Sequence, residues 1–182
     1  MTSRAFNPDQ LDVEACAKQA AELAGQWPLS QLDRLLASVH PETASAPDPV
    51  TWRAVGEQRT SRGGEPEFWL HVAAQGQVMM ECQRCLKPVA TALSVERSFL
   101  FVRGEETAAA LDAESEEDVL ALTRALDLRL LIEDELLLAL PLVPRHEVCP
   151  QPLPFQNEEL PEDDIPHPFA ALAALKGGGL PN

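Results

Sequence analysis

The sequence lacks a long uninterrupted run of apolar residues. Its most apolar stretch, residues 126–140, is broken by Arg129 and by three consecutive acidic residues at 133–135, whereas a membrane-spanning helix needs about 20 largely apolar residues. Residues 1–7 also lack the apolar segment of a secretory signal peptide. We therefore expect a cytoplasmic protein with no membrane partner, whose four cysteines are reduced or metal-bound rather than paired in disulfides.

Basic side chains are also scarce. The chain has 14 Lys and Arg against 29 Asp and Glu, a net charge of −15. Residues 50–103 nevertheless carry seven basic and five acidic side chains, whereas residues 104–182 carry four basic and seventeen acidic ones. Because Lys and Arg supply most non-specific affinity for phosphates, binding of nucleic acid by the whole surface is disfavoured. Only the central third is suited to RNA, and the acidic third would attract a basic protein.

The motifs of several enzyme classes are missing. The sequence has no glycine-rich phosphate loop, no Gly-x-Ser-x-Gly and no His-Glu-x-x-His. No acid or nucleophile motif accompanies His71, which we interpret as a structural or solvent-facing residue. Glu133, Asp134 and Glu135 would point about 100° apart on a helix and would form a polar outer stripe rather than a converging site. We expect no enzyme.

The hydrophobic pattern predicts an α+β fold. Asp12 precedes an alanine-rich segment at 13–24 that is typical of a helix, and a second helix is expected at 28–38. From Val50 the apolar residues alternate with period two, which predicts an antiparallel meander sheet of four to five strands, curved or barrel-like. Its expected strands lie at residues 50–62, 68–74, 77–82 and 89–101, with a turn at Gln75-Gly76 and a short fifth strand near 118–122.

Three further segments complete the expected organisation. The seven carboxylates of residues 104–118 favour a solvated acidic loop over structured chain. Asp127 is suited to cap a helix at about 128–140. Residues 1–149 would then form a single α+β domain, followed by an acidic, proline-rich tail at 150–182. The tail ends in a short amphipathic segment, 168–176, for which docking on its own core is favoured over binding a partner.

Four residues form a candidate metal site. Cys82 and Cys85 make a Cys-x-x-Cys pair between two expected strands, and His146 and Cys149 offer a second pair at matching spacing. Two such pairs are typical of a structural zinc site. The alternatives are a dithiol redox pair and a metal-free turn with reduced cysteines, so zinc is one of three interpretations. The redox alternative is the weakest, because that motif usually opens a helix of a βαβ unit.

The central third also carries the candidate contacts to phosphate. If several of its cations share one face of the sheet beside Trp52 or Trp69, a weak RNA platform is feasible. The alternative is ordinary surface charge on strands. The candidates are Arg53, Arg59, Arg62, Arg84, Lys87, Arg97 and Arg103.

Three sequence blocks together resemble one known family. They are Glu-Cys-Gln-Arg-Cys-x-Lys-Pro at 81–88, Glu-Asp-Glu-Leu-x-Leu-Ala-Leu-Pro-Leu-Val-Pro-x-His at 133–146, and Pro-Phe-Ala-x-Leu-Ala-x-Leu-Lys at 168–176. With Leu11-Asp12 at the first helix, their order and spacing are similar to those of the bacterial YceD family, the large ribosomal RNA subunit accumulation proteins. Some relatives carry a longer cysteine-rich tail, from which this chain departs.

The resemblance implies a non-catalytic ribosome biogenesis factor needed for synthesis, processing or stability of 23S ribosomal RNA. It brings no catalytic residues. Together with the charge distribution, it leads us to expect rRNA, the pre-ribosomal large subunit or a basic ribosomal protein as the partner. Two other hypotheses stay open: a zinc- or thiol-dependent enzyme, and an acidic chaperone-like protein binder without RNA contact.

Overall fold

The computed structural model describes residues 6–45, 48–61 and 63–150. Arg62, the tail from 151 onward and the amphipathic segment 168–176 lie outside the described residues. The elements are 3-10 helices Pro8–Gln10, Leu29–Gln31 and Pro41–Ser45, helices α1 (Val13–Lys18), α2 (Asp33–Ser38), α3 (Glu105–Glu114) and α4 (Leu128–Leu138), and strands β1 (Glu22–Trp27), β2 (Val50–Thr60), β3 (Pro66–Glu81), β4 (Pro88–Val102) and β5 (Asp118–Ala121).

The fold is α+β, as predicted, but the sheet is open and mixed. Its strand order is β1-β2-β3-β4-β5, so β1 and β5 are edges and no barrel closes. Strands β2, β3 and β4 pair antiparallel, as predicted, and β1 adds an antiparallel strand that was not predicted, whereas β5 runs parallel to β4. The predicted turn at Gln75-Gly76 is wrong, because β3 continues through it and pairs with β4 along its length. Buried residues keep the same alternation on both sides of Gly76.

The predicted first helix is too long. Asp12 does cap α1 by accepting a 3.0 Å hydrogen bond from the Ala15 N–H, but the helix ends at Lys18 and Ala20 has a left-handed φ of 46°. Residues 22–27 then form β1, because pairing with β2 satisfies their backbone groups and overrides helix propensity. The second predicted helix is likewise shorter and begins, after a 3-10 turn, at Asp33.

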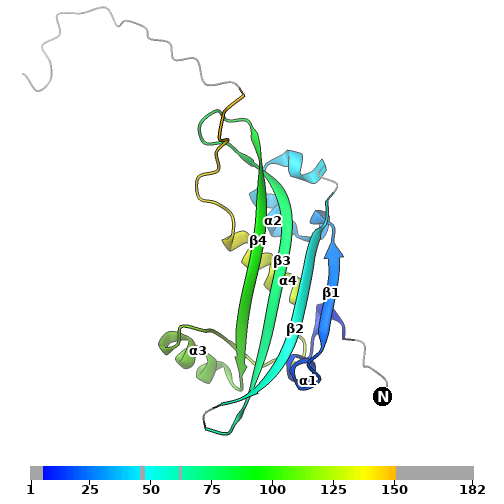
Figure 1. The fold of residues 1–182 in the computed structure, drawn as a ribbon, viewed down its shortest axis with the longest axis vertical. Helices are drawn as coiled ribbons and strands as arrows, with labels where there is room; N and C mark the ends of the chain where they lie inside the picture. The colour runs from blue at the N-terminus through cyan, green and yellow to red at the C-terminus, as the bar shows by residue number, and fades with distance from the viewer. Residues whose placement is uncertain (1–5, 46–47, 62, 151–182) are drawn as a thin grey trace, which may run out of the picture. The chain divides into compact units, whose positions relative to one another are not determined.

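One face of the sheet carries the core. Helices α1, α2 and α4 lie on this face (Figure 1), where α4 contacts β3 and β4. Alternate strand residues such as Leu70, Val72 and Phe99 are buried against Leu128 and Ile132 of α4. The opposite face of β2 and β3 remains open enough to expose charged side chains. No helix among the described residues is long and apolar enough to cross a membrane.

Residues 104–118 are not the predicted loop. Residues 105–114 form α3, which packs beside β5 with Ala108 buried. Alanines favour helix, and the acidic side chains of Glu105 and Glu106 in the first turn interact favourably with the helix dipole. The backbone N–H of Val119 donates to the Asp112 carboxylate at 3.0 Å and ties the helix to the strand that follows.

Helix α4 confirms the predicted cap and shows an unexpected role for Glu133. Asp127 accepts a 3.0 Å bond from the Leu130 N–H, and the helix ends at Leu138 rather than 140. Glu133 is 2% exposed rather than part of an outer stripe. Its carboxylate accepts from the backbone N–H groups of Arg34 and Leu35 at 2.8 and 3.1 Å. It therefore caps α2, whose own N-cap residue makes no side-chain bond.

Candidate metal centre

The Cys-x-x-Cys pair lies in the loop that joins β3 to β4. The N–H of Cys82 donates to the carbonyl of Lys87 at 3.0 Å, and the N–H of Leu86 donates back to the Cys82 carbonyl at 2.8 Å. Leu86 adopts a left-handed φ of 57°, which closes this tight loop. The segment after α4 runs back to it (Figure 1), and the Gln83 N–H binds the Pro144 carbonyl at 2.9 Å. We call residues 82–87 the knuckle and residues 141–149 the return segment.

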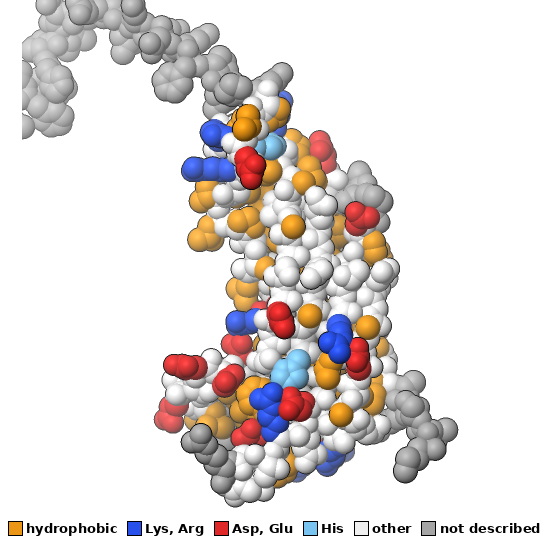
Figure 2. All heavy atoms as spheres, viewed as in Figure 1, with side chains coloured by type: hydrophobic (Ala, Val, Ile, Leu, Met, Phe, Trp, Pro, Cys, Tyr) orange, Lys and Arg blue, Asp and Glu red, His pale blue; other side chains and the backbone are white. Residues whose placement is uncertain are grey.

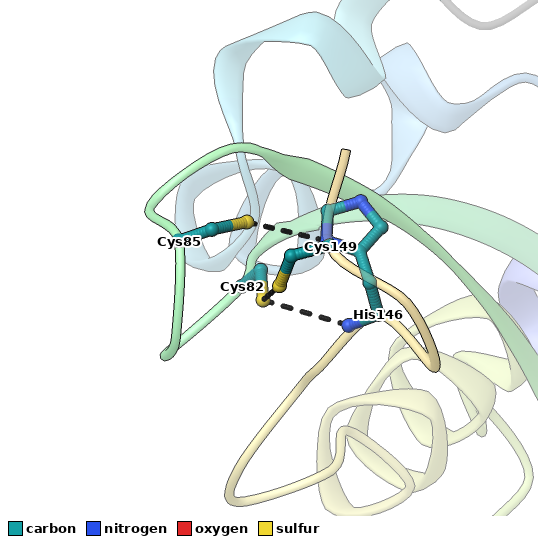
Figure 3. A group of neighbouring side chains, drawn as sticks. All are labelled: Cys82, Cys85, His146 and Cys149. Carbon is teal, nitrogen blue, oxygen red and sulfur yellow. Dashed lines mark hydrogen bonds between the residues drawn. The ribbon is translucent and has the colours of Figure 1, made fainter. Parts of the chain in front are cut away.

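The knuckle and the return segment bring the four predicted ligands together. The candidate ligand atoms of Cys82, Cys85, His146 and Cys149 all lie within 4.8 Å of one another. Figure 3 shows their side chains converging from the two segments. The Cys82 and Cys149 sulfurs are 3.9 Å apart, and the Cys85 sulfur is 3.4 Å from His146 Nδ1. Sulfur atoms bound about 2.3 Å from a tetrahedral zinc ion would lie about 3.8 Å from each other, so the spacing fits zinc.

Hydrogen bonds fix how these ligands are presented. His146 Nε2 lies 3.0 Å from the Pro88 carbonyl, so a proton on Nε2 leaves the Nδ1 lone pair facing the cysteines. The Arg84 side chain donates to the Cys149 sulfur at 3.0 Å and to the carbonyls of His146 and Glu147 at 2.9 and 3.2 Å. Arg84 therefore joins the knuckle to the return segment and balances thiolate charge.

The pKa values of the two knuckle thiols shift in opposite directions. Burial raises the pKa of Cys82, but hydrogen bonds from the backbones of His146, Arg84 and Cys85 lower it overall to about 5. Burial raises the pKa of Cys85, and the neighbouring Cys149 and Cys82 raise it further. The hydrogen bond to the Cys149 sulfur raises the pKa of the Arg84 guanidinium. A bound cation would therefore find one thiolate present and displace a proton from another thiol.

The sheet arginines among the predicted phosphate contacts are held by carboxylates. Arg53 binds Glu22 at 2.6 Å and Arg59 binds Glu57 at 2.8 Å on the open face. Arg97 pairs in register with the buried Val72, so it lies on the helix-covered face. Its partners there are Asp118 and Glu135, at 2.9 and 3.3 Å, and Arg103 binds Glu14 at 2.9 Å.

These arginines therefore do not form one cationic surface. Directly opposite strand residues point to the same face, so Arg53 and Arg59 share a face that Arg97 does not. Arg84 and Lys87 lie elsewhere, in the knuckle. Within the described part of the chain, Lys87 has no ion-pair partner. A carboxylate next to each sheet arginine leaves little net positive charge for phosphate.

Two features were not anticipated from the sequence. On the open face, His71 bridges strands through Glu57 and Ser98, each at 2.8 Å, while Arg59 lies 4.7 Å from the Trp69 ring centre. The strand register alone could have placed His71 beside Ser98, but no local sequence motif indicates that these residues group with Glu57 and Arg59. Around the knuckle, large aliphatic side chains are exposed (Figure 2), and the return segment carries a further exposed cation, Arg145. These aliphatic residues are Leu86, Leu142, Val143 and Val148.

The fold and the site together describe an α+β protein with an open five-stranded sheet and a Cys3His cluster at the β3–β4 loop. A family model described as large ribosomal RNA subunit accumulation protein YceD matches residues 70–176. A protein of the same description from Haemophilus influenzae is 32% identical over 167 residues, which cover 88% of this chain and 90% of the relative. The chain belongs to the YceD family, which confirms the resemblance. No solved structure matches the chain significantly.

Proposed function

We propose that this protein is a non-catalytic cytoplasmic factor that supports accumulation of the large ribosomal RNA, 23S in bacteria, by acting on the pre-ribosomal large subunit. The observation that carries the proposal is the 32% identity to the Haemophilus influenzae accumulation protein over nearly the whole chain. The matched family region begins in β3 and includes both halves of the Cys3His cluster. Deleting the gene should lower large-subunit rRNA relative to small-subunit rRNA, and the wild-type gene should restore it. Unchanged rRNA levels would overturn the proposal.

The Cys3His cluster is proposed to hold a structural zinc ion. Four protein ligands close a tetrahedral site, whereas catalytic zinc keeps one position for water or substrate. This donor set therefore favours a metal that fastens the knuckle to the return segment over a zinc-dependent enzyme. Elemental analysis of the purified protein should give one zinc per chain. A Cys82→Ser/Cys85→Ser variant should bind none, and retention of zinc by that variant would assign the metal elsewhere.

The acidic α3 region is the proposed contact for a basic large-subunit ribosomal protein. Figure 2 shows acidic side chains gathered over this region. Its carboxylates are exposed and, among the described residues, unpaired: Glu105, Glu106, Glu114, Glu116 and Glu117. The sheet arginines, in contrast, are already paired. This asymmetry favours a protein partner over direct binding of RNA by the sheet.

Pull-down from ribosome-containing extract tests this partner. The protein should recover a basic ribosomal protein at low salt and lose it as salt rises, because surface charge interactions are screened. Replacing the five α3-region glutamates with glutamine should weaken recovery at least several-fold. A control with equal charge loss at exposed positions elsewhere should not; it carries Glu42→Gln, Asp48→Asn, Glu65→Gln, Glu81→Gln and Glu96→Gln. Recovery of rRNA fragments without ribosomal protein would show that RNA is contacted first.

A further inference from the structure

Two contacts of the cluster join the knuckle to the return segment. Cys82 contacts the sulfur of Cys149 at 3.9 Å, although the two residues are 67 positions apart in sequence. Cys85, the close sequence neighbour of Cys82, has its sulfur against His146 Nδ1 at 3.4 Å. One pair of sulfurs in contact therefore joins the knuckle to the return segment, within a cluster whose four ligand atoms all lie within 4.8 Å of one another.

Access to solvent differs between the same two cysteines. Cys82 is 0% exposed and Cys85 is 4% exposed, whereas Cys149 is only half-buried. The Arg84 side chain donates to the Cys149 sulfur at 3.0 Å, so this sulfur lies next to a positive charge. A small oxidant from solvent therefore reaches the Cys149 sulfur before the buried Cys82 sulfur, which lies 3.9 Å from it.

We propose that Cys149 and Cys82 form a peroxide-driven, reversible disulfide. The Cys149 thiolate attacks a peroxide oxygen and the O–O bond breaks. This leaves a sulfenic acid on Cys149 and, once a proton is taken up, releases water from hydrogen peroxide. The Cys82 sulfur then attacks the Cys149 sulfur, the S–S bond forms and the sulfenic oxygen leaves as a second water. Two thiols lose two electrons and the peroxide gains them; a dithiol reductant reverses the change.

The disulfide would replace the proposed zinc link between the knuckle and the return segment. It removes two of the four zinc ligands and leaves only Cys85 and His146, too few to hold a structural zinc ion. The knuckle and the return segment stay joined, now by a covalent link. This loss of metal rests on the zinc site proposed above, whereas the formation of the bond rests only on the positions of the sulfur atoms.

Treatment of the full-length protein with hydrogen peroxide tests the proposal. Zinc-loaded and chelator-treated protein are oxidised, digested without reductant and mapped by mass spectrometry. The expected main product links Cys82 to Cys149, forms faster without zinc and disappears after dithiothreitol. Bound zinc should fall from one per chain to none as the linkage forms. A predominant Cys82–Cys85 linkage, or oxidation without any disulfide, would overturn the proposal.

Variants separate the bond from the metal. Cys85→Ser should still form the linkage, and Cys16→Ser serves as a control because Cys16 is buried in α1 away from the cluster. Cys149→Ser should lose it. Loss of the linkage in folded, chelator-treated Cys85→Ser protein would contradict the proposed pairing. Linkage in a wild-type protein that binds no zinc would refute the metal site and leave the disulfide standing.

Discussion

At Gly56 the backbone of α1 packs directly against strand β2. A Cβ placed there would lie 2.6 Å from the carbonyl carbon of Cys16 and 2.7 Å from the nitrogen of Ala17, and backbone atoms cannot rotate away. We expect Gly56→Ala to lower the free energy of unfolding by about 1–3 kcal/mol, measured by urea denaturation. At Gly63 a Cβ would meet only Ser61 Oγ at 3.6 Å. Equal losses in Gly56→Ala and Gly63→Ala would contradict this account.

Glu57, on the open face of the sheet, makes the stability of the fold depend on pH. Hydrogen bonds from Arg59 and His71 lower its pKa from an ordinary 4.5 to about 2. Because the folded-state pKa is depressed, the carboxylate stabilises the fold above about pH 4.5 and this contribution disappears as the pH falls through 2. NMR titration of the Glu57 carboxyl should show the low midpoint, and Arg59→Ala should raise it. If Arg53→Ala raised the Glu57 midpoint as much as Arg59→Ala does, the low pKa would come from the overall positive charge nearby rather than from these hydrogen bonds.

At the scale of elements, local pattern predicted some boundaries well and missed others for identifiable reasons. The helix after Asp127 was predictable because the cap and the leucine spacing agree. The helix of residues 105–114 was missed because its carboxylates suggest repulsion, whereas buried Ala108 and the Asp112 contact depend on β5. Strand β1 was missed because the alanine-rich segment that leads into it favours helix, and only pairing with β2 makes residues 22–27 a strand.

The uninterrupted β3 is testable by hydrogen exchange. Gly76 lies opposite Leu93 in the sheet, and a Cβ there would come within 2.9 Å of the Val50 side chain. The glycine therefore marks close packing inside a strand rather than a turn. Amides of β3 that are hydrogen-bonded to β4 on either side of Gly76 should exchange slowly, at rates like those around Val72. Rapid exchange confined to residues 75–77 would restore the turn that the sequence suggests.

At the scale of the whole molecule, the cluster was predictable as a set of residues but not as a geometry. Matching spacing identified Cys82, Cys85, His146 and Cys149. Their convergence depends on a long β3–β4 hairpin and on the chain after α4 returning to its tip, which no local pattern encodes. The feasible RNA platform required several cations on one face of the sheet, and the alternation of side chains along β2 does place Arg53 and Arg59 on the same face. This alternation could not reveal that Glu22 and Glu57 would neutralise them.

The position of the cluster also determines how much of the molecule would depend on the proposed zinc ion. Cys82 and Cys85 lie outside the main buried core, which joins the sheet to α1, α2 and α4. If the proposed zinc ion is bound, its removal by a chelator should therefore leave the core folded and loosen only the knuckle and the return segment. Hydrogen exchange should quicken at the amide of Gln83, which binds the Pro144 carbonyl, while amides around Leu70 keep their protection. Cooperative loss of protection throughout the sheet would show instead that the metal supports the whole fold.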